Sequence, residues 1–202
     1  MATDARERIL EAACDLIASD GIDDVRIARV ATRARASTAL VHHYFSTREE
    51  LLAEALVHSF ETAGQDRFAD APEGEDATHG LARAIEACLP LAGAQERDWT
   101  LWVELWLRAV RDPSMRPLAA DLYRRYRAWF AAAIEAGVAS GEFTTDRNPA
   151  ELADLAVALV DGLGVRALIQ DPELGVDRAR TLIAQSLAAE LGIAAEDLRI
   201  EG

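Results

Sequence analysis

The chain of 202 residues lacks several features that mark common protein classes. It has only two cysteines, each inside an apolar helical pattern, so neither a disulfide framework nor a C-x-x-C metal site is expected. No run of 18 apolar residues occurs, so no membrane-spanning helix is predicted. The N-terminal sequence MATDARERIL carries charges where a signal peptide has its apolar stretch, which predicts a cytoplasmic protein.

Lysine is absent as well, because all 21 basic residues are arginine; they stand against 35 acidic residues and give a formal net charge of −14. Such acidity argues against a nucleic-acid partner unless the basic residues are grouped. Residues 25–48 contain five arginines and no acid, and we call this segment the basic island. It can face phosphates while the acidic remainder resists nonspecific contact with nucleic acid.

No window of the sequence alternates apolar and polar residues, whereas helical periodicity is present throughout. Gly21 is a helix stop, Thr47 and Glu50 form a T-x-x-E capping box, and Asn148-Pro149 is typical of a helix start. The fold class expected is all-α, with a polar loop at 70–80. The predicted helices span 4–19, 27–34, 37–44, 48–66, 77–92, 95–111, 114–140, 149–170 and 175–191.

The segment 26–45, RIARVATRARASTALVHHYF, predicts two short helices joined by a tight turn. Ala31 and Ala34 allow the two helices to approach closely, and Val30, Leu40 and Val41 supply the inner contacts. Ser37 is placed to cap the second helix. Two short helices in this arrangement form a helix-turn-helix, whose second helix reads base edges in the major groove of DNA.

This segment resembles the TetR family of bacterial repressors, most closely its BetI-like branch. The family patterns I-A-x-x-A-G-V-S, Y-x-Y/H-F and S-K-E-x-L are matched by Val30-Ala31-x-x-Ala34-Arg35-Ala36-Ser37, His42-x-Tyr44-Phe45 and Thr47-Arg48-Glu49-x-Leu51. The resemblance implies a three-helix DNA-binding domain at 1–47 and a ligand-binding and dimerisation domain at 48–202, connected by helix 48–66. It implies a repressor that binds a palindromic operator as a homodimer and is released by a small-molecule inducer.

The resemblance also assigns roles in DNA binding. Ser37, Thr38 and Ala39 are expected nearest the base edges, where Thr38 can hydrogen-bond a base and Ala39 can touch a thymine methyl. Phosphate contacts are expected from other members of the same segment, although the histidines are equally compatible with a solvated helix face and Tyr44 with an edge of the core. The predicted DNA-binding residues are Arg26, Arg35, Ser37, Thr38, Ala39, His42, His43, Tyr44 and Arg48.

Three residues depart from the family pattern. Arg35 stands where the family has glycine, and a left-handed arginine there costs roughly 1 kcal/mol. Arg26 replaces a capping threonine, which loses a cap of about 1 kcal/mol but adds a possible phosphate contact. His42 replaces a tyrosine. The first departure bears on local stability, and the other two bear on the DNA contacts.

Three of the four tryptophans lie in the predicted helix 95–111. Trp99, Trp102 and Trp106 share one helical face, which is compatible with plain core or with an inducer pocket such as the family implies. Asp161 lies in an otherwise apolar helix and needs a partner, either a nearby arginine such as Arg166 or a cationic or hydroxylated ligand. The predicted ligand-binding residues are Phe60, Trp102, Trp106, Tyr126 and Asp161.

Helix 149–170 is apolar nearly all round, which predicts burial on two sides, one of them against a second copy of the chain. The resemblance implies that it forms a four-helix dimer interface together with the last helix. The predicted interface residues are Leu155, Leu159, Leu163, Ile183 and Leu187.

Two other functions compete with a DNA-binding regulator. Gly162-x-Gly164-x-x-Ala167 matches a dinucleotide-binding fingerprint, but no preceding strand is predicted, so an oxidoreductase is disfavoured. A helical ligand-binding or adaptor protein without a DNA role would share the helices but not the basic island. No nucleophile or metal-ligand pattern occurs, so we expect no enzyme activity, no cofactor and no metal site.

Overall fold

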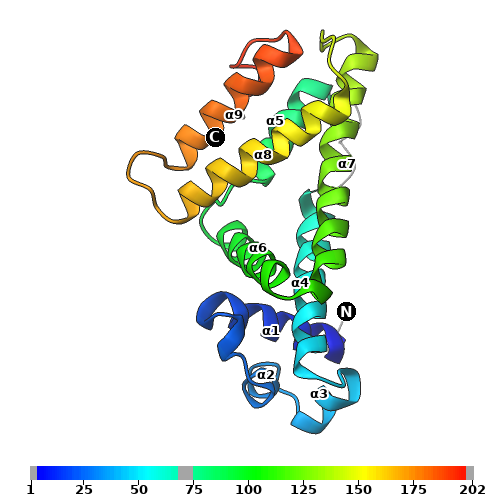
Figure 1. Cartoon of the computed structure of the whole chain (residues 1–202), viewed down its shortest axis with the longest axis vertical. Coiled ribbons are helices and arrows are strands. Elements are labelled where there is room, and N and C mark those ends of the chain that lie inside the picture. The colour runs from blue at the N-terminus through cyan, green and yellow to red at the C-terminus, as the bar shows by residue number, and fades with distance from the viewer. Residues whose placement is uncertain (1–3, 68–74, 199–202) are drawn as a thin grey trace. The chain divides into compact units, whose positions relative to one another are not determined.

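The computed structural model describes residues 4–67 and 75–198 of the chain, and helices are the only regular secondary structure in these two ranges. The all-α expectation is therefore confirmed (Figure 1). The chain packs as two compact units, residues 1–65 with 97–119 and residues 66–96 with 120–202. We call them the first and the second unit.

The first unit is built on the N-terminal helices. It contains α1 (Ala5–Asp20), the 3-10 turn η1 (Ile22–Asp24), α2 (Ile27–Arg33) and α3 (Thr38–Tyr44). It also contains most of α4 (Arg48–Arg67), most of α6 (Ala94–Arg111) and the 3-10 turn η2 (Pro113–Met115). Side chains of α1 form its centre, with Ile9, Ala13 and Ile17 fully buried.

The second unit consists of α5 (Ala77–Ala87), most of α7 (Arg116–Ser140), α8 (Pro149–Leu168) and α9 (Val176–Leu191). α8 packs along α9, and α9 also contacts α5. Arg180 on α9 pairs with Glu86 on α5, its Nη2 lying 2.8 Å from Oε1. Phe130 and Ile134 of α7 are fully buried in this unit.

Side-chain caps define the starts of several helices. Asn148 Oδ1 accepts from the amide of Ala150 at 2.9 Å and Pro149 occupies the first turn of α8, as the sequence predicted. At the start of α4, Thr47 Oγ1 accepts from the amide of Glu50 at 3.0 Å. The second half of that capping box differs from expectation, because the Glu50 carboxylate accepts from the amide of Ser46, at 2.7 Å, one residue before the expected donor.

The packing units do not coincide with the expected division at residue 47. The N-terminal half of α4 packs with the first unit, where the Cys14 thiol donates to the carbonyl of Ala55 at 3.1 Å. α6 joins the same unit through Arg97, whose Nη2 lies 2.9 Å from Glu11 and 3.0 Å from Asp15 on α1. The functional division at residue 47 stays a prediction. Residues 70–74 of the expected loop lie outside the described ranges.

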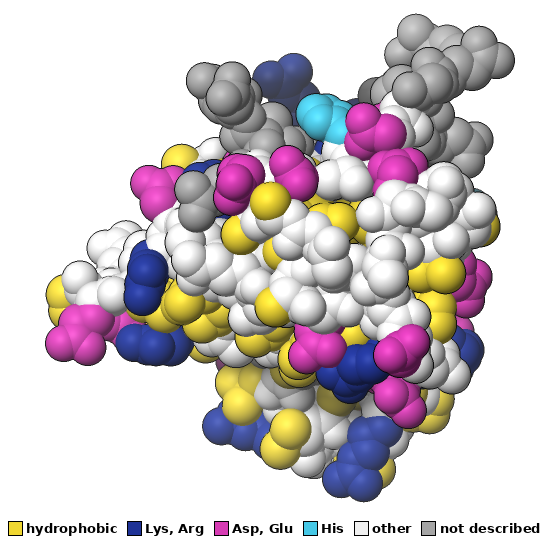
Figure 2. Space-filling view, turned by 90° about the horizontal axis from the view of Figure 1, so that it is seen from above, with side chains coloured by type: hydrophobic (Ala, Val, Ile, Leu, Met, Phe, Trp, Pro, Cys, Tyr) yellow, Lys and Arg dark blue, Asp and Glu magenta, His cyan; other side chains and the backbone are white. Residues whose placement is uncertain are grey.

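Both cysteines are buried free thiols, as expected. Burial raises the pKa of Cys14 to about 12, because the thiolate would lose its hydration without gaining a charge partner strong enough to compensate. Figure 2 shows acidic side chains at several places on the face it displays, with hydrophobic ones exposed between them, in keeping with the net charge.

Candidate functional site

A tight, hydrogen-bonded turn joins α2 to α3. The amide of Ala36 donates to the carbonyl of Ala31 at 2.9 Å, and the amide of Arg35 donates to the carbonyl of Thr32 at 3.2 Å. This pair of bonds is a Schellman motif, which requires a left-handed residue, and Arg35 has φ +53°. Ser37 then caps α3, its Oγ accepting from the amide of Leu40 at 3.1 Å. The predicted helix-turn-helix is therefore present.

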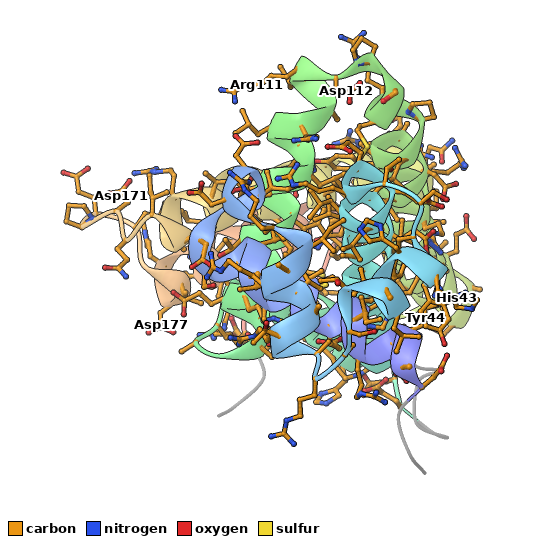
Figure 3. The ribbon with its side chains drawn as sticks, turned by 90° about the horizontal axis from the view of Figure 1, so that it is seen from below. His43, Tyr44, Arg111, Asp112, Asp171 and Asp177 are labelled. Atoms are coloured by element: carbon orange, nitrogen blue, oxygen red, sulfur yellow. The ribbon has the colours of Figure 1, made fainter. Side chains whose placement is uncertain are left out.

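The two helices expose one face and bury the other. Val30 and Val41 are fully buried and Leu40 is half-buried, so the expected inner contacts are present. Ser37, Thr38 and Ala39 are exposed at the start of α3, as are His42 and His43 further along. Tyr44 is half-buried and its ring lies edge-on to His43, with centroids 5.2 Å apart (Figure 3). The residues of α3 that are expected to face DNA are thus accessible in the single chain.

The basic island is less available than its sequence suggests. Arg29 pairs with Asp20 at 2.6 Å and Arg33 with Asp15 at 2.9 Å, so acids of α1 neutralise both. Arg26 is exposed, with Nη1 2.7 Å from the carbonyl of Asp23. Among the residues that the structure describes, none pairs with the exposed guanidinium of Arg35. Arg35 is therefore the arginine of the island that is most accessible to a phosphate.

Arg48 has partners that the sequence did not suggest. Its guanidinium donates to the carbonyls of Ile22 at 2.6 Å, Val25 at 2.8 Å and Asp23 at 3.1 Å, and its side chain is 22% exposed. These bonds fasten the start of α4 to the segment that leads into α2. The expected phosphate contact of Arg48 stays a prediction, but the observed bonds position the helix-turn-helix.

Four aromatic side chains of α4 and α6, in the first unit, form one cluster. Phe60 of α4 lies edge-on to Trp102 of α6, with centroids 5.0 Å apart. Trp106 lies 5.9 Å from Trp102 and 6.1 Å from Trp99. Three of the five residues predicted to bind a ligand, Phe60, Trp102 and Trp106, are therefore in contact. Trp102 and Trp106 are only half-buried, so part of each ring surface is accessible.

The other two predicted ligand residues, Tyr126 and Asp161, belong to the second unit. Tyr126 packs against Phe130, with centroids 5.4 Å apart. The hydroxyl of Tyr123 donates to Asp161 Oδ2 at 2.7 Å. The expected alternative that Asp161 pairs with Arg166 is wrong, because Arg166 bonds instead to Asp171, from Nε to Oδ2 at 2.7 Å.

Burial of Asp161 changes its acidity. Desolvation raises its pKa to about 6, although the bond from Tyr123 acts in the opposite direction. The pKa of Tyr123 is also raised, by burial and by the neighbouring carboxylate. The pair therefore holds a carboxylate that changes charge close to neutral pH.

Sequence reasoning missed a buried polar pair beside the aromatic cluster. Asp98 and Ser59 are 8% and 6% exposed, and Ser59 Oγ lies 3.5 Å from Asp98 Oδ1. Asp98 precedes Trp102 by one helical turn, and Ser59 is adjacent to Phe60. The signal in the sequence was an acid on the same helical face as the tryptophans.

The residues predicted for a dimer interface divide into two groups. Leu155, Leu159 and Leu163 on α8 are half-buried within the single chain, so each keeps accessible apolar surface. Ile183 and Leu187 on α9 have no exposed surface, because they form part of the core of the second unit. Ile183 and Leu187 therefore have no accessible surface with which to contact a partner chain.

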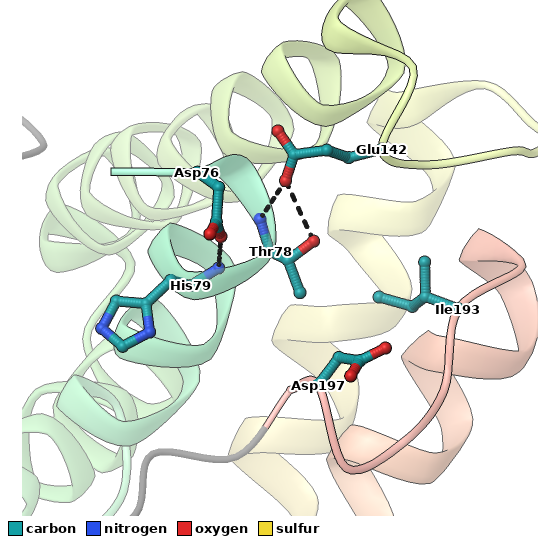
Figure 4. Close-up of a pocket in the computed structure, with 6 residues that line it drawn as sticks. All are labelled: Asp76, Thr78, His79, Glu142, Ile193 and Asp197. Atoms are coloured by element: carbon teal, nitrogen blue, oxygen red, sulfur yellow. Dashed lines mark hydrogen bonds between the residues drawn. The ribbon is translucent and has the colours of Figure 1, made fainter. Parts of the chain in front are cut away.

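Two hollows lie apart from these residues. One, of about 490 Å³, is lined by Asp76, Thr78, His79, Glu142, Ile193 and Asp197 (Figure 4). Its Glu142 carboxylate accepts from the amides of Ala77 and Thr78 at the start of α5, and these bonds lower its pKa. The Glu142 carboxylate therefore caps the start of α5. A smaller hollow, of about 160 Å³, lies where Arg108 of α6 approaches Asp23 of η1, with Nη1 3.5 Å from Oδ1.

Family models match both halves of the chain. Residues 9–55 match the bacterial regulatory proteins of the tetR family, and residues 77–192 match the C-terminal domain of BetI-type transcriptional repressors. The chain belongs to the TetR family. Curated relatives are the HTH-type transcriptional regulators BetI of Brucella anthropi, 25% identical over 92% of this chain and 93% of the relative, and of Cronobacter sakazakii, 28% identical over 94% and 92%.

Solved structures of TetR-type regulators have the same fold. A transcriptional regulator from Saccharomonospora viridis in complex with choline is 32% identical, with a TM-score of 0.81 over 92% of this chain and 95% of that one. A TetR-family transcriptional regulator from a Rhodococcus species is 27% identical, with a TM-score of 0.81 over 93% and 98%.

This TetR-family chain is a BetI-like transcriptional regulator and not an enzyme. The glycine pattern at 162–167 lies wholly inside α8 and does not connect a strand to a helix, so the oxidoreductase alternative fails. TetR-family regulators bind DNA and small molecules and act as dimers. Within the described ranges, each helix is too short or too polar to cross a membrane.

Proposed function

We propose that this BetI-like regulator is a repressor that binds a palindromic operator as a homodimer and leaves it when a small cationic ligand binds. The observation that carries the proposal is the capped and uncovered start of α3, which follows a Schellman turn on α2. A short helix presented in this way fits the major groove, where its first residues meet base edges.

Thr38 and Ala39 are proposed to read bases, because both are exposed in the first turn of α3. Arg26, Arg35, Ser37, His42, His43 and Tyr44 are proposed to contact phosphates or to flank the groove. For Arg48 a positioning role is proposed in place of the phosphate contact expected from the sequence, since its guanidinium is bonded to three backbone carbonyls.

A homodimer is supported by the accessible face of α8. Leu155, Leu159 and Leu163 keep apolar surface there, and Ala158 and Gly162 are exposed between them. On α9, Leu182 is half-buried and replaces Ile183 and Leu187 in the proposed interface. Two-fold symmetry would place two α3 helices on successive major grooves, roughly 34 Å apart.

A cationic ligand is supported by the aromatic cluster and by the choline bound to the relative from Saccharomonospora viridis. Aromatic faces attract alkylammonium groups through the ring quadrupole. α6, which carries the tryptophans, also carries Arg108, whose partner Asp23 stands just before α2. A ligand that shifts α6 can therefore act on the helix-turn-helix through η1, and the coupling is reciprocal.

The test starts from random duplex DNA, from which the purified protein should select a palindrome. Fluorescence anisotropy on the selected site should show tight binding that weakens as salt rises. Thr38→Ala should change the preferred bases, whereas Arg35→Asn should weaken binding to every sequence about equally. Choline added to the complex should release the DNA.

The competing function is a helical ligand-binding protein without a DNA role. Under that hypothesis no sequence would be selected, and retention of DNA would be weak and equal for palindromic and scrambled duplexes. Either result would refute the proposed repressor.

A further inference from the structure

The structure assigns a binding site for an alkylammonium cation to the first unit, at Asp98 and Ser59 beside the rings of Phe60, Trp102 and Trp106. The inference rests on the proposed function and names the carboxylate that recognises the charge of the ligand. Sequence reasoning placed this role on Asp161, in the second unit.

Asp98 and Ser59 are both buried. Asp98 and Ser59 are the charged and the polar side chain found among the buried residues of the described ranges. Water screens little at a carboxylate that is 8% exposed, so the field of Asp98 acts strongly on any nearby cation.

The aromatic rings lie on the same two helices as Asp98 and Ser59. Asp98 and Trp102 lie four residues apart on α6, and Ser59 and Phe60 are neighbours on α4. Phe60 and Trp102 meet edge-on with centroids 5.0 Å apart, and Trp106 extends the cluster 5.9 Å beyond Trp102. The carboxylate and the aromatic rings therefore converge from two helices of one unit.

Arg97, the neighbour of Asp98, forms ion pairs with acids of α1. Arg97 precedes Asp98 in the sequence, but its guanidinium pairs with Glu11 and Asp15 on α1, at 2.9 and 3.0 Å. Its charge is thus compensated by two other acids. This arrangement orders the N-terminal end of α6, on which Asp98 lies.

A quaternary ammonium has no N–H group, so it is held by charge and by aromatic faces instead of hydrogen bonds. Asp98 supplies the charge, Trp102 and Trp106 supply accessible ring surface, and Ser59 orients the carboxylate through its hydroxyl. A neutral molecule of the same shape gains only the apolar part of this interaction. We therefore expect the site to bind a cation more tightly than a neutral molecule of the same size.

The experiment measures binding of choline and of 3,3-dimethylbutan-1-ol, its neutral carbon isostere, by tryptophan fluorescence and calorimetry on the full-length protein. The unmodified protein should prefer choline at least tenfold. Asp98→Asn keeps the size of the side chain and should abolish that preference, mostly through weaker choline binding. Trp102→Leu should weaken the binding of choline more than the binding of the isostere. Glu135→Gln, on the exposed face of α7, serves as the control.

Asp161→Asn tests the rival carboxylate. If Asp161→Asn removes the preference for choline and Asp98→Asn keeps it, the assignment to Asp98 is overturned. Equal affinity of the unmodified protein for choline and the isostere overturns it as well. Operator binding is measured on the same samples, so a failed ligand site is distinguished from a failed repressor by DNA affinity that stays intact.

Discussion

The amide of Ala36 donates to the carbonyl of Ala31 at 2.9 Å and thereby encloses Arg35 in a left-handed conformation, with φ +53°. Other helix ends of the chain have glycine at positive φ, as at Gly21, Gly141 and Gly192. A left-handed arginine costs about 1 kcal/mol relative to glycine. We interpret this cost as the consequence of keeping a cation beside α3.

Arg35→Gly is therefore expected to stabilise the protein by about 1 kcal/mol per chain while weakening its binding to DNA. The slope of log affinity against log salt should fall by about 1 per subunit, since one phosphate contact is lost. Urea unfolding and anisotropy at several salt concentrations measure the two effects.

Gln170 provides a matched control for Arg35. It occupies the same position of a Schellman motif at the end of α8, with φ +56°, and the amide of Asp171 donates to the carbonyl of Arg166 at 3.0 Å. Gln170→Gly should give a similar gain in stability without any change in DNA affinity. Unchanged DNA affinity in Arg35→Gly would refute the role of Arg35.

Arg48→Ala should destabilise the DNA-binding helices because three carbonyls, those of Ile22, Asp23 and Val25, lose their donor. We expect a loss of about 2 kcal/mol. Arg48→Lys should recover only part of it, because an ammonium does not reproduce the planar fork of donors. At temperatures where the variants stay folded, the salt dependence of DNA binding should match that of the unmodified protein. A flatter salt dependence in Arg48→Ala, with unchanged thermal stability, would instead support a phosphate contact.

Features set by neighbouring residues were predictable from the sequence. The Ser37 cap and the Asn148-Pro149 start each depend on a few adjacent positions, and the structure confirms them. The left-handed conformation that the family pattern raised as a possibility for Arg35 is observed as well. Partners distant in sequence were not predictable. Arg48 reaches carbonyls more than 20 residues away and Tyr123 reaches Asp161 across 38 positions, because only the packing of the helices brings them together.

Periodicity alone also left the role of each apolar face open. The pattern of α9 identified Ile183 and Leu187 as buried, and they are, but it did not distinguish the core of one chain from an interface between two. The exposed fraction of each side chain within the single chain shows that Ile183 and Leu187 belong to the core of one chain. Asp98 shares a helical face with the tryptophans, but this pattern alone does not tell how deeply its carboxylate is buried.

Gly162→Leu tests the proposed dimer face of α8. A Cβ atom at Gly162 would meet nothing within 4 Å in the single chain, and leucine favours a helix over glycine by about 1 kcal/mol. The folded chain should therefore tolerate the change, while the added side chain keeps a partner helix at a distance. Sedimentation should show a weaker dimer, and operator affinity should fall with it. Glu135→Leu, on the exposed face of α7, adds the same side chain elsewhere and should leave the dimer intact. A Gly162→Leu protein that dimerises as tightly as the parent would exclude close helix contact at this point.

Asp161→Asn should make stability less dependent on pH. The pKa of Asp161 is raised to about 6 in the folded chain from an ordinary value of 3.8, so between these values the folded state holds more protons than the unfolded state. The free energy of unfolding therefore decreases as pH rises from 4 to 6 and keeps that deficit above pH 6. Asparagine carries no charge and still offers an oxygen to the Tyr123 hydroxyl, so it should remove the deficit, which is about 3 kcal/mol at pH 7. Urea unfolding of both proteins at pH 4 to 8 gives the difference directly, since other titrating groups cancel. The two proteins should converge near pH 4 and separate up to pH 6. A difference that stays constant over the whole range would mean that Asp161 titrates normally, because its bond with Tyr123 balances its burial.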